Sequence, residues 1–132
     1  MRGIGVDQLT VIEVADSLEA FGARYLARTF TDVEAQATVG MAAGRRAAYL
    51  AGRFAAKEAV FKALRYPRSR PLPWTDIEIV RDDEGWPVVR LHGRAREHAT
   101  ATEVSGVEVS ISHSGDTALA VAVAHDRSPT HR

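Results

Sequence analysis

Residues 52–64 of the chain read Gly52-Arg53-Phe54-Ala55-Ala56-Lys57-Glu58-Ala59-Val60-Phe61-Lys62-Ala63-Leu64. They belong to a longer segment, residues 42–64, which is rich in alanine, leucine and arginine and contains two glycines and no proline. This composition predicts a helix over 42–64. At about 100° per residue, the large apolar side chains of the segment gather into one arc, which we expect to face the core.

Three charged side chains lie on or beside this apolar arc. Lys57 falls inside it, whereas Glu58 and Lys62 stand one turn apart at its edge, next to the small residues Ala51 and Ala55. We expect this alanine seam to leave room for a ligand between helix and sheet. Two interpretations stay open from the residues alone. One is an anion or metal site, and the other is an ordinary helix-stabilising pair worth about 0.2–0.5 kcal/mol.

The rest of the chain predicts an α+β domain. We expect strands near residues 3–7, 77–79, 88–89, 107–111 and 118–124, helices at 13–30 with a break at Gly22, at 31–40 and at 94–103, and a loop at Pro67, Pro71 and Pro73. Thr31-Asp32-Val33-Glu34 matches a capping box, which begins a helix. Turn-forming residues at 82–85 and 114–116 predict two β-hairpins. The fold expected is an antiparallel β-sheet with the long helix and shorter helices packed on one side, and 118–124 as its buried central strand.

The composition is typical of one small domain in a reducing compartment. The chain has 132 residues, 45% of them hydrophobic, so we expect a single domain over 1–125 and a disordered tail over 126–132. Its 17 basic and 17 acidic residues cancel, which argues against bulk nucleic acid or an anionic membrane as a partner. It has no cysteine, which excludes disulfides and cysteine nucleophiles. Because no apolar run has the length of a membrane span, we expect a cytoplasmic protein.

Three segments resemble the holo-acyl-carrier-protein synthase family of 4′-phosphopantetheinyl transferases. They are Gly3-Ile4-Gly5-Val6-Asp7, the helix motif at 52–63, and Val109-Ser110-Ile111-Ser112-His113-Ser114. The helix motif is highly specific, and the order of the elements agrees, so the resemblance covers nearly the whole chain. It implies the fold of that family and a Mg²⁺-dependent transfer reaction. In that reaction the 4′-phosphopantetheine group of coenzyme A moves to a serine of an apo acyl carrier protein, and adenosine 3′,5′-bisphosphate is released.

The resemblance implies a metal site and a catalytic base. Asp7 and Glu58 would bind Mg²⁺, an ion that prefers one or two carboxylates together with waters and phosphate oxygens. Lys62 would hold the diphosphate of coenzyme A. Glu58, directly or through a metal-bound water, would accept the proton of the attacking serine, with His113 as the alternative base. Without the resemblance, Asp7 would be a turn-forming residue at the end of a strand.

A second group of residues is implied to contact coenzyme A. These residues are Arg53, Gly85, Pro87, Ser112, His113 and Ser114. Arg53 would reach a phosphate, with the one on the ribose as a candidate, and His113 would approach the nucleotide phosphates together with the two serines beside it. The turn Glu84-Gly85-Trp86-Pro87 would lie against the nucleotide. Without the resemblance, Arg53 would be an exposed helix arginine, His113 a structural residue, and this segment only a turn.

The resemblance also implies two protein partners. Members of the family form homotrimers with active sites at subunit boundaries, which would give a small core extra burial. They also dock an acidic helix of the acyl carrier protein on basic residues of an early helix. Arg24 and Arg28 stand one turn apart in the corresponding segment here. The alternative for these arginines is a solvated helix face.

The chain departs from the family pattern after the long helix. Members usually continue with a Gly-Thr-Gly loop, whereas this chain has Arg65-Tyr66-Pro67-Arg68-Ser69-Arg70-Pro71. Either the three arginines replace the missing backbone amides in phosphate binding, or the loop is solvent-exposed and coenzyme A binds less tightly. Unchanged affinity for coenzyme A after all three arginines are replaced by alanine would rule out the first interpretation.

A second departure follows Asp7. The chain reads Gln8-Leu9-Thr10-Val11 there, and Glu13 stands where a basic residue often helps to bind the carrier. This difference suggests an enzyme dedicated to one pathway, such as polyketide or related secondary metabolism, over general fatty-acid synthesis. Two non-catalytic functions also stay open, a coenzyme A-binding module or carrier-interacting subunit, and a structural trimer. Paired magnesium carboxylates argue against a mere binder, which has no need of them.

Overall fold

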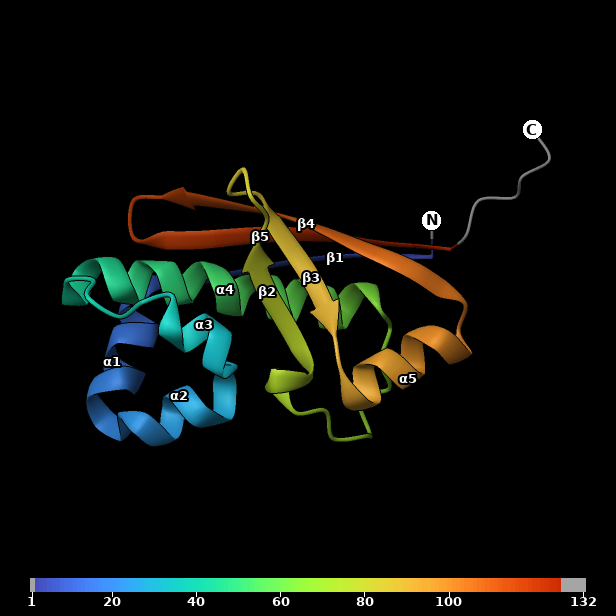
Figure 1. Cartoon of the computed structure of the whole chain (residues 1–132), viewed down its shortest axis with the longest axis horizontal. Coiled ribbons are helices and arrows are strands. Elements are labelled where there is room, and N and C mark those ends of the chain that lie inside the picture. The colour runs from blue at the N-terminus through green and yellow to red at the C-terminus, as the bar shows by residue number, and fades with distance from the viewer. Residues whose placement is uncertain (1, 127–132) are drawn as a thin grey trace.

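The computed structural model of the chain describes residues 2–126. In chain order its elements are β1 (Gly3–Thr10), α1 (Val11–Phe21), α2 (Ala23–Thr29), α3 (Asp32–Gln36), α4 (Ala43–Ala63), the 3₁₀ turn η1 (Trp74–Asp76), β2 (Ile77–Arg81), β3 (Pro87–Leu91), α5 (Gly93–Ala101), β4 (Val104–Ser114) and β5 (Thr117–Asp126). The strand pairs β1–β5, β2–β3 and β4–β5 are all antiparallel. The α+β class predicted from the sequence is confirmed (Figure 1).

The strands form two sheets where the sequence analysis expected one. The larger sheet has the order β1-β5-β4, and the hairpin β2-β3 forms the second sheet. Strand β5 is central, as predicted, but it is buried on one face only. Its alanines at 118, 120, 122 and 124 are buried, whereas Leu119 and Val121 on the opposite face are exposed. The large sheet therefore has one face in the core and one partly apolar face open.

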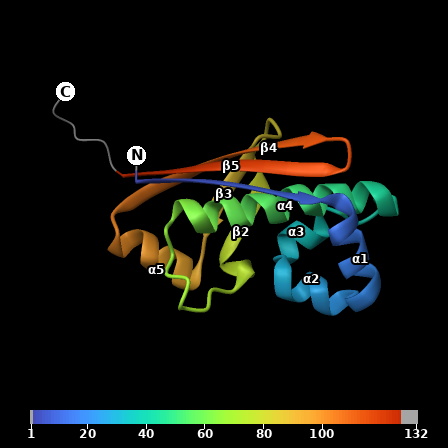
Figure 2. The same cartoon turned by 180° about the vertical axis from the view of Figure 1, so that it is seen from behind.

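Helix α4 is the central element of the molecule. It runs along the large sheet, the β2-β3 hairpin crosses it on one side, and β1 runs along it in the view from behind (Figures 1 and 2). Helices α1, α2 and α3 gather near the N-terminal end of α4, and α5 lies near its C-terminal end (Figure 1). The elements that carry the predicted site residues thus all lie around one long helix.

Two glycines allow β1 to approach α4 very closely. A Cβ atom at Gly3 would lie 2.0 Å from the carbonyl oxygen of Ala63, and one at Gly5 would lie 2.0 Å from the carbonyl oxygen of Ala59. Real Cβ atoms do not come so close to oxygen, so only glycine fits at either position. Asp7 is the next residue on the same face of β1 and projects beside the helix.

Two capping boxes and one glycine shape the N-terminal helices. Thr10 caps α1 with Glu13, and Thr31 caps α3 with Glu34. Gly22, with a φ of 53°, ends α1 and precedes α2, which confirms the expected helix break. The first capping box also explains why β1 continues to Thr10, beyond the strand predicted at 3–7.

The helix expected at 31–40 is shorter, Asp32–Gln36, and the strand expected at 107–111 is longer, Val104–Ser114, whereas two other helix boundaries agree closely with the sequence. The helix predicted at 42–64 is α4, Ala43–Ala63, and the one predicted at 94–103 is α5, Gly93–Ala101. Strand β5 includes Asp126, the first residue of the predicted tail, and the rest of that tail, 127–132, lies outside the described residues. None of the helices in residues 2–126 is both long enough and apolar enough to cross a membrane.

Candidate functional site

Asp7, Glu58 and Lys62 meet where β1 lies on α4. Lys62 Nζ is 2.9 Å from Asp7 Oδ1 and donates a hydrogen bond of 3.0 Å to the backbone carbonyl of Val6. Asp7 and Glu58 line one cavity, and the charge of Asp7 raises the pKa of Glu58. Lys62 therefore pairs with an aspartate that lies 55 residues away in the sequence, and not in the simple helix pair with Glu58 that the sequence left open.

The two carboxyl groups crowd each other. Burial and, after it, the charge of Asp7 together raise the pKa of Glu58 to about 7, while Lys62 opposes the shift. A bound divalent cation would relieve this repulsion. Within residues 2–126, no three His, Cys, Asp or Glu side chains gather as a metal site. A pair of carboxylates suits Mg²⁺, which keeps waters and takes phosphate oxygens as further ligands.

A cavity of about 230 Å³ opens beside this pair, on the side of α1. Its lining residues are Asp7, Gln8, Leu9, Glu13, Val14, Ser17, Tyr25, Phe54 and Glu58. Burial raises the pKa of Tyr25 to about 12, helped by the charges of Glu58 and Glu13, so its hydroxyl keeps its proton. The sequence analysis placed the ligand space along Ala51 and Ala55. That expectation is wrong, because both alanines are completely buried in the core.

Glu13 has a structural task in this region. Its Oε1 accepts a hydrogen bond of 2.9 Å from the backbone N–H of Thr10, and its own N–H donates to Thr10 Oγ1 at 3.2 Å. The departure from the family pattern after Asp7 thus builds the junction between β1 and α1 as a capping box. Glu13 also adds a negative charge beside Glu58 and Tyr25, which the sequence analysis had not foreseen.

Arg53 is buried without full hydrogen bonding. Only 6% of its surface is exposed, and its Nε and Nη2 atoms have no partner. Its guanidinium lies 4.3 Å from the ring centroid of Tyr49, and Arg81 lies 5.1 Å from the same centroid. Burial lowers the pKa of Arg53, and the nearby charge of Arg81 lowers it too. A buried guanidinium with unpaired N–H groups carries a desolvation cost that a bound anion would relieve.

The structure corrects one interpretation of Arg53 and adds Tyr49 and Arg81 to the candidate site. The alternative to a binding role for Arg53 was an exposed helix arginine. That alternative is wrong, because Arg53 is buried. Tyr49 precedes it by one helical turn, a spacing that sequence reasoning had not used. Arg81 gives no sequence signal at all, because β2 brings it to α4 from a distant part of the chain.

His113 contacts α4 well before Glu58. One ring nitrogen, Nε2, is 3.0 Å from the carbonyl oxygen of Ala48, and the ring lies so close to Gly52 that a Cβ there would be 3.0 Å from its Cε1 atom. Gly52 precedes Glu58 by six residues, about 9 Å of helix. Within one chain, therefore, the structure does not bring His113, or Ser112 and Ser114 beside it, to the Asp7–Glu58 pair.

The predicted nucleotide turn lies at the tip of the β2-β3 hairpin. The Asp82 side chain accepts hydrogen bonds of 2.9 Å from the backbone N–H groups of Glu84 and Trp86, and Gly85 has a φ of 92°. Pro87 begins β3, and Trp86 is 67% exposed. A rigid turn thus presents an aromatic ring to the outside.

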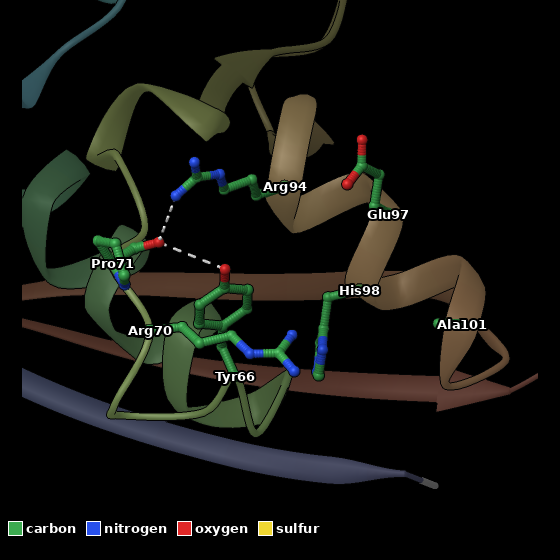
Figure 3. A pocket seen from close by; sticks show the side chains of 7 residues that line it. All are labelled: Tyr66, Arg70, Pro71, Arg94, Glu97, His98 and Ala101. Carbon is green, nitrogen blue, oxygen red and sulfur yellow. Dashed lines mark hydrogen bonds between the residues drawn. The ribbon is translucent and has the colours of Figure 1, made fainter.

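The arginine-rich loop after α4 is anchored by Tyr66. The ring of Tyr66 packs against Phe61 and His98, and its hydroxyl donates to the Pro71 carbonyl at 3.3 Å, an oxygen that Arg94 also contacts (Figure 3). Arg70 and Arg94 line a cavity of about 370 Å³ there. The loop is therefore held in place by side chains, unlike a glycine loop. Its part in phosphate binding stays a prediction.

The comparisons with known proteins agree with this geometry. The sequence pattern of the 4′-phosphopantetheinyl transferase superfamily matches residues 3–124. The holo-[acyl-carrier-protein] synthase of Desulforudis audaxviator is 44% identical over 132 residues, covering 98% of this chain and 97% of that protein. The crystal structure of the Neisseria meningitidis holo-[acyl-carrier-protein] synthase has a TM-score of 0.82 at 31% identity and covers 96% of this chain and 99% of its own.

A further structure shows a ligand in a relative. The Helicobacter pylori holo-[acyl-carrier-protein] synthase in complex with coenzyme A has a TM-score of 0.78 at 26% identity, and covers 92% of this chain and 99% of its own. The chain belongs to the 4′-phosphopantetheinyl transferase superfamily, a family of enzymes, and to its holo-acyl-carrier-protein synthase branch. The resemblance seen in the sequence is thereby confirmed.

The unpaired guanidinium of Arg53 leads to a prediction on stability. Replacing Arg53 by methionine removes two buried N–H groups without partners and keeps an unbranched chain of similar length. We expect the free energy of unfolding to rise by about 1 kcal/mol, measured by urea denaturation. Arg81→Met, at an exposed position on the same ring, is the matched control and should leave stability unchanged. A less stable Arg53→Met protein would contradict this account.

Proposed function

We propose that this protein transfers the 4′-phosphopantetheine group of coenzyme A to a serine of an apo acyl carrier protein. The reaction depends on Mg²⁺ and releases adenosine 3′,5′-bisphosphate. The observation that carries the proposal is that Asp7 and Glu58 line one cavity, with the ammonium group of Lys62 bonded to Asp7. The curated relatives are named holo-[acyl-carrier-protein] synthases, and the Helicobacter pylori relative is described with coenzyme A, which supports this assignment.

The proposed metal site assigns each of these residues a role. Asp7 and Glu58 hold Mg²⁺, which when bound neutralises charge on the phosphate oxygens. Lys62 has its side chain 44% exposed, so its N–H groups can turn from Asp7 to the diphosphate. Glu58, directly or through a metal-bound water, accepts the proton of the attacking serine. His113 is the alternative base.

The nucleotide is proposed to bind along the other half of α4. Arg53 and Arg81 receive a phosphate group. Both guanidinium groups lie on the ring of Tyr49, and the Nε and Nη2 atoms of Arg53 lack partners. Gly85 and Pro87 lie against the nucleotide at the hairpin tip. Ser112, His113 and Ser114 complete the phosphate contacts from the end of β4.

We propose a homotrimer as the active form. His113 and the Asp7–Glu58 pair lie apart in one chain, so a site that uses both needs a second copy of the chain. The open face of the large sheet offers the contact surface, because Ile4, Val6, Leu119 and Val121 are all exposed there. Apolar surface of this kind on neighbouring strands is typical of protein interfaces.

Sedimentation equilibrium tests the trimer. We expect the mass of three chains, and we expect Val6→Glu to give single chains that have lost most of the transferase activity, because a charge on the apolar face opposes association. Glu97→Gln, at an exposed position on α5 away from the large sheet, is the control. A fully active single chain would contradict the proposal.

Arg24 and Arg28 are the proposed docking residues for the carrier. Both are exposed on α2, and Phe21, 58% exposed at the end of α1, adds an apolar contact nearby. Attraction to an acidic carrier helix would guide the serine towards Glu58. With no cysteine and an acyl carrier protein as its partner, the enzyme is proposed to act in the cytoplasm. The unusual Glu13 fits a carrier of one dedicated pathway.

Charge reversal tests this docking surface. The double variant Arg24→Glu/Arg28→Glu should raise KM for the carrier by about tenfold or more and leave KM for coenzyme A unchanged. The effect should shrink as salt is added, since exposed charges are screened. Arg96→Glu, an exposed arginine on α5, is the control. A carrier KM that moves no more than in the control would exclude docking at α2.

The central assay weighs the carrier by mass spectrometry after incubation with the protein, Mg²⁺ and coenzyme A. We expect the carrier to gain one phosphopantetheine group, and chelation of the metal to abolish the gain. Glu58→Gln and Asp7→Asn should each lower kcat/KM by at least about 100-fold, because they remove metal ligands and the base. Glu97→Gln, an exposed residue on α5, is the matched control.

The same assay separates the other functions. Binding of coenzyme A without a gain in carrier mass would show a coenzyme A-binding module. Neither binding nor gain would show a structural trimer. Transfer at the wild-type rate by Glu58→Gln, with normal binding of metal and coenzyme A, would show that Glu58 is not the base.

A further inference from the structure

A buried ion pair joins α3 to α4 on the side of the helix away from β1. Lys57 Nζ is 2.7 Å from Glu34 Oε1, and both side chains are completely buried. The sequence placed Lys57 in the apolar arc of α4 and gave it no role. Glu34 belongs to α3, 23 residues earlier, and was singled out only as part of a capping box.

Most polar contacts of this pair go to the backbone of β2 and the turn before it. Lys57 Nζ also donates to the carbonyl oxygens of Trp74, at 3.0 Å, and Ile77. Glu34 Oε2 accepts a hydrogen bond of 2.6 Å from the backbone N–H of Ile79. The three donors of the ammonium group are thus all used, and such completeness is what allows a charge pair to be buried.

The contacts continue into the rest of the hairpin. Thr31 donates its backbone N–H to Glu34 Oε1 at 2.8 Å and its hydroxyl to Glu78 on β2. Glu78 Oε1 is in turn 3.0 Å from a ring nitrogen of His92, just after β3. One connected network of charged groups therefore holds the hairpin to α3 and α4.

This attachment matters because the hairpin is not part of the large sheet. No ladder of hydrogen bonds to β1, β4 or β5 fixes the position of β2. Lys57 and Glu34 hold β2 at Ile77 and Ile79, and the same strand ends at Arg81, which lies on the Tyr49 ring of α4 beside Arg53. The ion pair and the arginine cluster are therefore two contacts of one strand with one helix.

We infer that Lys57 and Glu34 are positioning residues for coenzyme A: by fixing β2 on α4, they set Arg81 against Arg53 so that both guanidinium groups meet one phosphate. The inference rests on the proposed function, since it concerns how that substrate is held. A pair that positions the substrate differs from a purely structural ion pair in the effect of its removal. Loss of the pair should change the binding of coenzyme A, and not only the stability of the fold.

The test variant removes both charges together. Removing one partner alone would leave the other charge buried and unpaired, which is strongly destabilising. In Lys57→Met/Glu34→Gln neither residue of the pair carries a charge. The glutamine oxygen can still accept from Ile79, and its amide nitrogen takes the place of Oε1, so the capping bond from the Thr31 N–H is lost. We expect a folded protein whose KM for coenzyme A is raised about tenfold, with kcat and the carrier KM nearly unchanged.

Two comparisons separate positioning from stability. Leu64→Ala, a core change elsewhere on the same chain segment, should lower the unfolding temperature without moving KM for coenzyme A. Arg81→Met should raise that KM in the wild-type protein but add nothing further in the double variant, because residues that act through one another are not additive. Additive effects, or an unchanged KM in the double variant, would overturn the inference.

A second, milder variant tests the inference if the double variant does not fold. Glu34→Asp keeps the charge and shortens the side chain by one methylene group, so it should shift β2 and raise KM for coenzyme A in the same direction; an unchanged value there overturns the inference equally. Wild-type transfer is measured first. If the wild-type protein does not transfer, the proposed function fails and the inference falls with it, whereas active wild-type protein with unaltered variants contradicts the inference alone.

Discussion

Strand β1 lies against α4 at a distance that only glycine permits. Gly3 and Gly5 face the carbonyl oxygens of Ala63 and Ala59, where a Cβ atom would come within 2.0 Å. The buried alanines of β5 add small side chains on the next strand of the sheet. Because the backbone of β1 is so near, the short side chain of Asp7 reaches Lys62 and Glu58. The candidate metal site is thus a direct consequence of small residues on two facing elements.

Charges around α4 are arranged in three ways. Lys57 is buried and fully paired, Lys62 is half in solvent and paired with a single carboxylate, and Arg53 is buried with unpaired N–H groups. A fully paired cation holds structure, whereas the other two keep donors for something else. A chain with no net charge can therefore still bind a strongly anionic substrate.

Much of the fold follows from local sequence. Helix α4, the break at Gly22 and the capping box at Thr31 are set by propensity, glycine and short-range hydrogen bonds, so the sequence predicts them well, whereas the capping box at Thr10 was not predicted. The division into two sheets was missed, because it depends on which strands meet across α4. For the site, the motif on α4 pointed to Glu58 and Lys62. The contact of Arg81 with the ring of Tyr49, beside the buried Arg53, depends on β2, which lies far along the chain. Such contacts have no local signature.

The most direct test is a crystal structure of the protein with Mg²⁺ and coenzyme A bound. The account predicts one ion per chain with oxygen atoms of both Asp7 and Glu58, directly or through its waters, in its coordination sphere, at about 2.0–2.1 Å for direct ligands. Lys62 should then have left Asp7 for the diphosphate. An ion bound elsewhere, or Asp7 still bonded to Lys62 with substrate in place, would contradict it.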